Sequence, residues 1–159
     1  MHVSQKCIDL VKSFEGFSAK AYLCPAKIWT IGYGSTRIYG RPVKQTDVIT
    51  KDIAEVMLSD ELAEFEQVVK DAIGTISISQ GMFDALVSIV YNVGPGSSSK
   101  DGIIRLKSGK KSTLLSKVIA GDKDGAAAEF LKWTRAGGVV LNGLVKRRKA
   151  EHDLFMSES

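Results

Sequence analysis

Three side chains that can take part in bond cleavage lie within one short stretch of the 159-residue chain. They are the carboxylate of Glu15, the thiol of Cys24 and the hydroxyl of Thr30. A carboxylic acid can serve as a general acid, and a thiolate or a hydroxyl can act on an attacking water molecule. The stretch 15–36 therefore predicts one half of a catalytic site, built from a helix and the strands that follow it.

The residues before Glu15 predict a helix that ends at this carboxylate. Apolar residues recur at the spacing of one helical face: Val3, Cys7, Ile8, Val11 and Phe14. Gly16 stands where a helix usually has its terminal glycine, so the helix should end at about Glu15. The negative end of the helix dipole favours the protonated form of a carboxyl group, which is the form a general acid needs. A surface Glu at a frayed helix end is the ordinary alternative.

The segment 28–35 alternates at the period of a β-strand and places Thr30 beside two glycines. The face expected to pack inward carries three apolar residues: Trp29, Ile31 and Tyr33. Thr30 shares the other face with Gly32 and Gly34, which predicts an open shelf that a ligand could approach closely. A hairpin bend explains the two glycines as well, and both interpretations stay open.

The rest of the chain is predicted to be helical. A long helix is expected at 50–71, with Thr50 as its N-cap and with several exposed acids that suit a helix joining two lobes. Further helices are expected at 80–93, 112–119, 124–133 and 144–155. The last of them carries a basic run that we interpret as a solvated face: Lys146, Arg147, Arg148 and Lys149. The segment 97–111 is expected to be a surface insertion or to contain a short helix.

Composition narrows the possible partners. The net charge of +4 favours an anionic partner but does not choose among nucleic acid, a phospholipid surface and an acidic cell wall. No apolar run approaches the roughly 20 residues needed to span a membrane. Lys6, Asp9 and Lys12 interrupt the N-terminal segment, so we expect no signal peptide.

The cysteines and histidines predict neither a metal site nor a cofactor. Cys7 and Cys24 form no disulfide framework and no metal-binding signature, although the sequence leaves open whether they can pair. His2 and His152 stand at opposite ends of the chain and lack the spacing of ligands.

These residues resemble the phage lysozymes (endolysins) of glycoside hydrolase family 24, of the T-even phage type. The family pattern is a Glu, eight residues, an Asp or Cys, five residues and a Thr, which is the spacing of Glu15, Cys24 and Thr30. The Glu-Gly pair and the string WTIGYGST are intact. Four further strings follow in the family's order: MFDALVSIVYNVG, STLL, AAAEFLKW and GGVVLNGLVKRR. The likeness runs from Val3 to about Phe155.

The resemblance implies an α+β, two-lobed lysozyme-like fold in a single domain of residues 1–159. A small N-terminal lobe of about residues 15–50 would hold a β-hairpin or sheet. The long helix at 50–71 would connect it to a helical lobe of residues 74–159 and the N-terminal helix, with a sugar-binding cleft between the lobes.

The resemblance also implies hydrolysis of the β-1,4 bond between N-acetylmuramic acid and N-acetylglucosamine in peptidoglycan, with inversion, which lyses the host cell. Glu15 would protonate the leaving glycosidic oxygen, and Thr30 would help to orient the attacking water. In the family the final helix supplies an Arg near this Glu, and Arg147 and Arg148 are both candidates. Such an Arg would favour the ionised carboxylate and so oppose the effect of the helix end.

Cys24 takes the place that an Asp usually holds in this family. An Asp there stabilises developing positive charge or assists the water as a base. A neutral thiol does neither well, because an ordinary Cys pKa of about 8.5 leaves the group mostly protonated at pH 7. A nearby cation could lower that pKa and supply a thiolate. A structural role as a small buried residue is the alternative.

Two departures from the family affect the expected partners. The segment 97–111 is longer than the usual connection before STLL, so the rim of the helical lobe should differ. We expect the chain to lack the hydrophobic signal-anchor that some relatives have. We therefore expect a monomer that stays in the host cytoplasm until a holin-like protein lets it reach the periplasm and the cell wall. Its partner would be the glycan strands of peptidoglycan, without nucleic acid and without membrane insertion.

Three other functions compete with hydrolysis. A lytic transglycosylase would use Glu15 as its only acid and base and would close a 1,6-anhydro ring without water. A non-catalytic module would bind peptidoglycan or a partner protein. The interpretation as a nucleic-acid-binding protein depends only on the basic last helix, since the sequence shows no groove-reading motif and no aromatic stacking platform.

Overall fold

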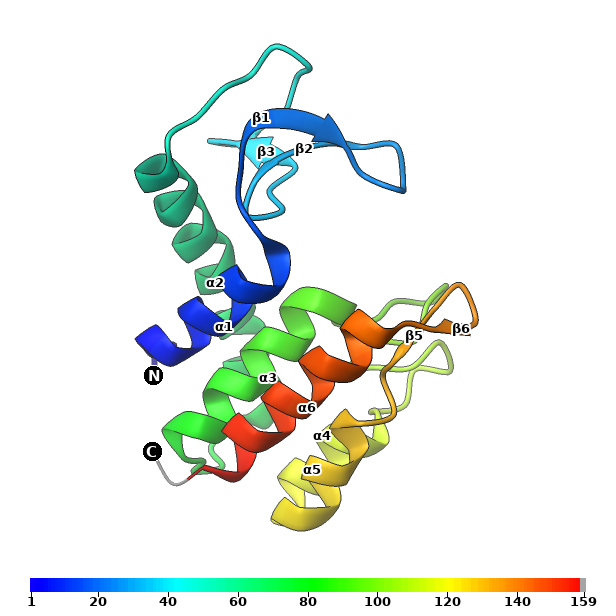
Figure 1. Ribbon diagram of the computed structural model, residues 1–159. Helices are drawn as coiled ribbons and strands as arrows, with labels where there is room; N and C mark the ends of the chain where they lie inside the picture. Colours follow the sequence, from blue (N-terminus) through cyan, green and yellow to red (C-terminus); the bar gives the residue numbers. More distant parts are fainter. Residues whose placement is uncertain (158–159) are drawn as a thin grey trace. The chain divides into compact units, whose positions relative to one another are not determined.

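The structure, a computed structural model, describes residues 1–157 and divides into two units. One unit comprises residues 8–63, and the other comprises residues 1–7 together with the chain from residue 64 onward. Figure 1 follows the helices and small sheets along the chain, and this mixture confirms the predicted α+β class. The predicted lobe boundaries, 15–50 and 74–159, stay a prediction.

The unit of residues 8–63 contains most of α1, all of the first four strands and the first half of α2. The bounds are α1 Gln5–Glu15, β1 Ser18–Leu23, β2 Trp29–Gly32, β3 Arg37–Ile38, β4 Arg41–Pro42 and α2 Lys51–Ile73. Helix α1 ends at Glu15, as predicted. Thr50 caps α2, also as predicted, because its hydroxyl accepts a hydrogen bond from the backbone N–H of Ile53 at 3.2 Å.

Strands β1 and β2 form an antiparallel hairpin that holds the candidate residues. Leu23 pairs with Trp29, and Tyr22 pairs with Thr30. The turn between the strands closes where the N–H of Cys24 donates to the carbonyl of Ile28 at 3.1 Å.

The hairpin unit has a small apolar core, to which β2 contributes directly. The core residues of β2, the segment after it and α2 include Ile31, Tyr33, Ile38, Ala54, Leu58 and Leu62. Of the three residues predicted to face inward, Ile31 and Tyr33 are buried, whereas Trp29 is only half-buried. Thr30 and Gly32, on the other face of β2, are buried as well, so the strand is enclosed on both faces.

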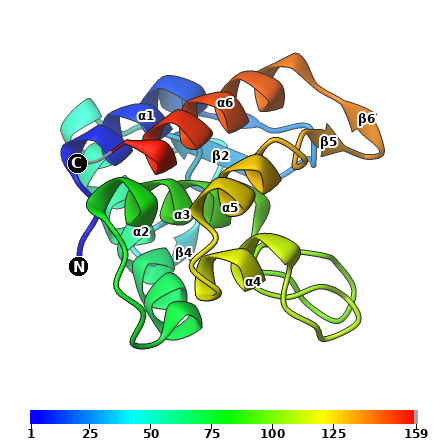
Figure 2. The same ribbon diagram turned by 90° about the horizontal axis from the view of Figure 1, so that it is seen from below.

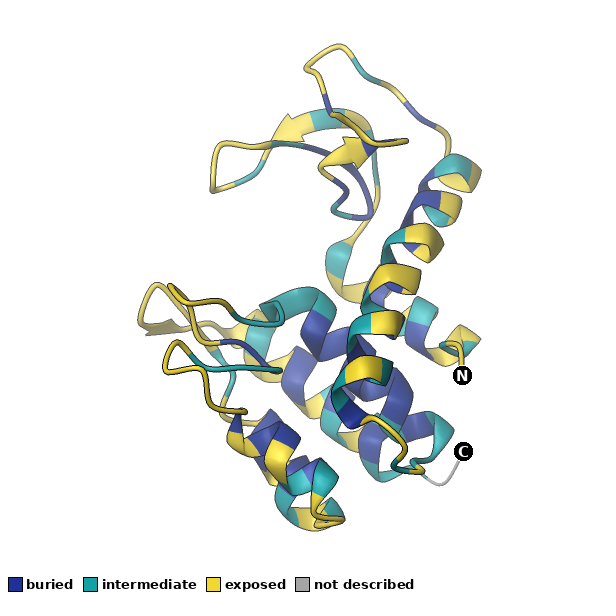
Figure 3. Cartoon of the chain, turned by 180° about the vertical axis from the view of Figure 1, so that it is seen from behind, coloured by how far each residue is buried: buried dark blue, intermediate teal, exposed yellow. Residues whose placement is uncertain are grey.

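The helical unit is built around α3. Its elements are α3 Gln80–Val93, α4 Thr113–Ile119, α5 Lys123–Phe130, β5 Arg135–Ala136, β6 Val139–Val140 and α6 Asn142–Met156. Helix α3 lies along α6, and α6 packs on α5 (Figure 2). Every residue from Phe83 to Val90 is buried, so α3 is the dark blue centre of this unit in Figure 3. A helix buried on all sides in this way is typical of a protein core.

Most helix boundaries of this unit follow local signals. Ser79 caps α3 by accepting from the N–H of Met82, and Ser112 caps α4 by accepting from the N–H of Leu115. The predicted helix 124–133 was wrong at its end, because α5 stops at Phe130. The chain then forms the β5–β6 hairpin, whose turn is Gly137-Gly138. Both glycines have positive φ, as a two-residue hairpin turn requires.

Within residues 1–157 the helices are too short or too polar to cross a bilayer.

Candidate active site

The three residues selected from the sequence all fall in the unit of residues 8–63. Glu15 is the last residue of α1, Cys24 begins the turn after β1, and Thr30 lies in β2. The hairpin register brings the ends of β1 and β2 together, and with them Cys24 and Thr30. The structure therefore places these two side chains next to each other.

The Glu15 carboxylate lies against the backbone of Gly34. A Cβ atom added to Gly34 would stand 2.7 Å from Oε2 of Glu15, which is closer than two such atoms can approach. Gly34 also has a φ of +87°, a conformation that L-residues with side chains rarely adopt. Glycine at this position thus gives the carboxylate the space that it occupies.

The open shelf predicted beside Thr30 is not formed. A Cβ atom on Gly32 would meet Cβ of Ala54 and Cδ1 of Ile49, each at 3.2 Å, so Gly32 allows β2 to approach α2. Gly34 likewise leaves room for the carboxylate of Glu15. Both glycines permit close contacts within the protein, and Gly32 is buried whereas Gly34 is half-buried.

Hydrogen bonding lowers the pKa of the Cys24 thiol. The largest cause is a bond from the backbone N–H of Ile28, and bonds from the N–H of Ala26 and the hydroxyl of Thr30 act in the same direction. Partial desolvation of the thiol opposes them. Donors aimed at the sulfur stabilise the thiolate. These donors lower the pKa of Cys24, which is the effect that we expected from a nearby cation.

Thr30 can also donate to a carbonyl oxygen in the same turn. Its buried hydroxyl lies 3.0 Å from the carbonyl of Ile28. A hydroxyl carries one proton, so it cannot donate to this carbonyl and to the Cys24 thiolate at the same time. Deprotonation of Cys24 would therefore redirect the Thr30 proton toward the sulfur.

Tyr22 is a neighbour of this group that the sequence analysis did not select. It pairs with Thr30 across the hairpin. Burial raises the pKa of Tyr22, and the negative charges of Glu15 and Cys24 raise it further. Its position two residues before Cys24, near the end of the strand that leads into the turn, was the signal available in the sequence.

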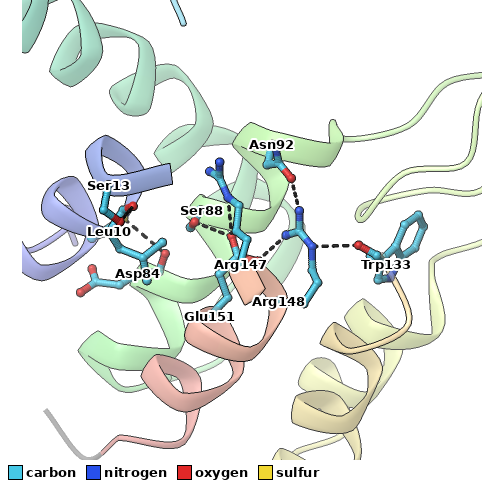
Figure 4. A network of polar contacts seen from close by, with 10 residues as sticks. Leu10, Ser13, Asp84, Ser88, Asn92, Trp133, Arg147, Arg148 and Glu151 are labelled. Carbon is cyan, nitrogen blue, oxygen red and sulfur yellow. Dashed lines mark hydrogen bonds and ion pairs between the residues drawn. The ribbon is translucent and has the colours of Figure 1, made fainter. Parts of the chain in front are cut away.

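Arg147 and Arg148 are both buried, so the solvated face predicted for the basic run is wrong at these two positions. Nε of Arg147 lies 3.4 Å from Oε2 of Glu151, and Nη1 of Arg148 contacts the other oxygen of the same carboxylate. Ser88 donates its hydroxyl proton to Glu151 (Figure 4).

Further contacts attach Arg148 to two other elements. Its Nε donates to the carbonyl of Trp133 at 2.9 Å, and Nη2 contacts the side-chain oxygen of Asn92 (Figure 4). Burial lowers the pKa of Arg148 and raises that of Glu151. Both arginines thus belong to a buried network of the helical unit, and a role for either beside Glu15 stays a prediction.

Across residues 1–157 we find no group of three or more His, Cys, Asp or Glu side chains that could hold a metal ion. The two cysteines are free thiols, one in each unit.

Comparison with known proteins places the chain in a family. The profile of the phage lysozyme family matches residues 12–151. The endolysin of Bacillus phage B103 is 45% identical over 99% of this chain, and the chain spans 55% of that relative's length.

Two solved structures share the fold over nearly their whole length. The endolysin from Escherichia coli O157:H7 phage FAHEc1 has a TM-score of 0.84 and 36% identity, covering 100% of this chain and 96% of that one. The muramidase domain of SpmX from Asticaccaulis excentricus has a TM-score of 0.78 and 30% identity, covering 99% of each chain. The α+β fold is thus lysozyme-like, and the chain belongs to the phage lysozyme family.

Proposed function

We propose that this chain lyses peptidoglycan as a muramidase, with Glu15 as its general acid. The observation that carries the proposal is the position of Glu15, which ends α1 with its carboxylate against Gly34. It lies in the same unit as the hydrogen-bonded pair of Cys24 and Thr30. The muramidase domain of SpmX, which has the same fold, supports the choice of bond.

The proposed reaction cleaves the β-1,4 bond between N-acetylmuramic acid and N-acetylglucosamine. Glu15 gives its proton to the glycosidic oxygen as the C–O bond breaks. A water molecule held by Thr30 attacks the anomeric carbon from the opposite face, and the Cys24 thiolate takes the proton that this water loses. Water is thereby added across the bond, and the configuration at the anomeric carbon inverts.

Lytic transglycosylation is the second candidate, since a weak base at position 24 would favour a reaction without water. The hydrogen-bond donors around Cys24 favour its thiolate, and a thiolate can accept the proton that water loses in hydrolysis. The masses of the released muropeptides separate the two reactions, since hydrolysis adds a water and formation of the 1,6-anhydro ring does not.

The test compares the wild type with Glu15→Gln on outer-membrane-permeabilised Gram-negative cells, with turbidity as the measurement. We expect Glu15→Gln to lower the rate of lysis by about 100-fold or more, because a general acid contributes about 10² to 10⁴. The urea midpoint of the variant should match that of the wild type, which shows that only the chemistry was removed. Equal lysis by both proteins would overturn the assignment.

The remaining functional expectations stay proposals. They are the monomeric state, release from the host cytoplasm through a holin-like protein, and binding to glycan strands without nucleic acid or membrane insertion.

A further inference from the structure

The segment 97–111 carries the entire net charge of the protein. It contains five basic residues, Lys100, Arg105, Lys107, Lys110 and Lys111, and one acid, Asp101. Its net charge of +4 equals that of the whole chain, so the other residues are balanced between basic and acidic side chains. We call this segment, between α3 and α4, the lysine loop.

The base of the lysine loop is anchored to the helical unit. Ile103 is fully buried, and its N–H donates to the carbonyl of Gly94 at 3.1 Å. Its own carbonyl accepts from the hydroxyl of Ser112, the residue that caps α4. A Cβ atom on Gly102 would lie 2.1 Å from the backbone nitrogen of Gly96, so the two backbones cross in direct contact. The base of the loop is therefore packed into the fold. The short helix that was one of the two expectations for this segment does not form among residues 97–111.

The tip of the loop is a tight turn with its lysines facing solvent. The N–H of Leu106 donates to the carbonyl of Lys110 at 2.8 Å, and Gly109 donates back to Leu106 at 2.9 Å. The single acid, Asp101, accepts from the backbone N–H of Lys107 at 2.7 Å. The exposed lysines are Lys100, Lys107, Lys110 and Lys111.

Within residues 1–157 some basic side chains elsewhere on the surface have an acidic partner, which the lysines of the loop lack. Elsewhere, five basic side chains pair with acids: Lys12 with Glu55, Arg41 with Asp47, Lys117 with Asp122, Lys132 with Glu129 and Lys149 with Asp153. None of the ion pairs found among residues 1–157 includes a lysine of the loop. A fixed cluster of one sign of charge attracts and retains polyanions.

The side chains of the loop restrict which polyanion fits. The segment has no aromatic residue, so it offers no platform on which nucleic-acid bases could stack. Ile103 is buried, and Ile104 and Leu106 are half-buried, so no exposed aliphatic side chain can enter a bilayer. The loop therefore offers charge as its main means of recognition. Peptidoglycan suits such recognition, because its peptide stems present free carboxylates at regular intervals.

We propose that the lysine loop binds the stem-peptide carboxylates of peptidoglycan and so holds the protein on the wall. This inference rests on the proposed function for the identity of the polymer, but it does not depend on the chemistry of Glu15. The loop keeps the protein on the polymer, and the proposed cleavage takes place at Glu15.

The test measures sedimentation with purified peptidoglycan sacculi in the Glu15→Gln background, so that the proposed cleavage does not consume the polymer. The test variant replaces Lys100, Lys107, Lys110 and Lys111 by Gln. The matched control replaces four exposed lysines outside the loop by Gln and so has the same net charge: Lys6, Lys20, Lys44 and Lys146.

We expect the loop variant to bind about tenfold more weakly at low salt, since each exposed charge contact contributes a factor of about two. The control should change binding by less than about twofold. The difference should disappear near 1 M salt, where the Debye length falls to about 3 Å. Sacculi whose carboxylates have been converted to amides should bind the parent and the loop variant equally.

Three outcomes would overturn the inference. The control variant could weaken binding as much as the loop variant, which would leave net charge as the whole effect. Amidated sacculi could still distinguish the two proteins. Phosphatidylglycerol vesicles or duplex DNA could bind the loop more tightly than sacculi do, which would assign it to a different partner. Failure of the proposed function is seen separately, as lysis by Glu15→Gln.

Discussion

Each unit of this protein contains one cysteine and one carboxylate of special interest, and the two pairs stand in opposite environments. In the hairpin unit, Cys24 is half-buried, and Glu15 ends a helix with its carboxylate against Gly34. In the helical unit, Cys7 and Glu151 are completely buried. The same two residue types therefore occur once where a substrate could reach them and once where it could not.

The surroundings of each group explain the difference. Burial raises the pKa of Cys7, with the charge of Asp84 as the next cause, whereas hydrogen-bond donors lower that of Cys24. Glu151 is enclosed by Arg147, Arg148 and Ser88, which occupy both of its oxygens. The comparison shows that environment, more than residue type, separates groups suited to chemistry from groups that serve packing.

The strongest test of this comparison is Glu151→Gln. Removing this charge takes away the carboxylate that both buried arginines contact, and breaking a buried pair costs about 3 to 5 kcal/mol of stability. That is a large part of the 5 to 15 kcal/mol that holds a typical domain together. Urea unfolding measures the loss. As a control, Asp153→Asn removes an exposed partner of Lys149 and should cost at most about 1 kcal/mol. Equal stabilities of the two variants would contradict a structural role for Glu151.

The next test concerns the space beside Glu15. Gly34→Ala and Gly40→Ala introduce the same strain, because both glycines have a φ of +87°. The stability loss should be about 1 to 2 kcal/mol in each case. Only at Gly34 would the new Cβ meet a neighbour, Oε2 of Glu15 at 2.7 Å, whereas nothing lies within 4 Å at Gly40. A displacement of about 1 Å in a catalytic group can cost about 100-fold in rate.

We therefore expect Gly34→Ala to lose lytic activity and Gly40→Ala to keep it, at matched urea midpoints. Similar activity in the two variants would show that the carboxylate of Glu15 does not need its present position.

The smallest expected effect concerns the reactivity of the two thiols. The pH dependence of their alkylation by iodoacetamide measures it. Hydrogen bonds lower the pKa of Cys24 and stabilise its thiolate, so its alkylation should reach half its maximal rate at a pH below the pKa of an ordinary thiol. Cys7 should react only when the protein unfolds. Thr30→Val removes one donor and should move the Cys24 midpoint upward, whereas Thr30→Ser should leave it in place. Alkylation of folded Cys7 as fast as that of Cys24 would contradict the difference.

Local rules were sufficient for much of the fold. The end of α1 before Gly16 and the cap at Thr50 were predicted from short-range patterns, because a helix terminus depends on residues a few positions away. The β5–β6 hairpin was missed. It lies between the predicted helices 124–133 and 144–155, and strands of only two residues each are too short to show an alternating pattern.

The sequence alone also selected Glu15, Cys24 and Thr30 as a candidate site, because they fall within one short stretch of the chain. Their catalytic roles stay predictions. Only the tertiary structure showed that Gly34 makes room for Glu15 and that Arg147 and Arg148 are buried on Glu151. Burial depends on contacts between elements distant in the sequence, here α3, the segment after α5, and α6. A run of four basic residues cannot by itself reveal which of them those contacts will enclose.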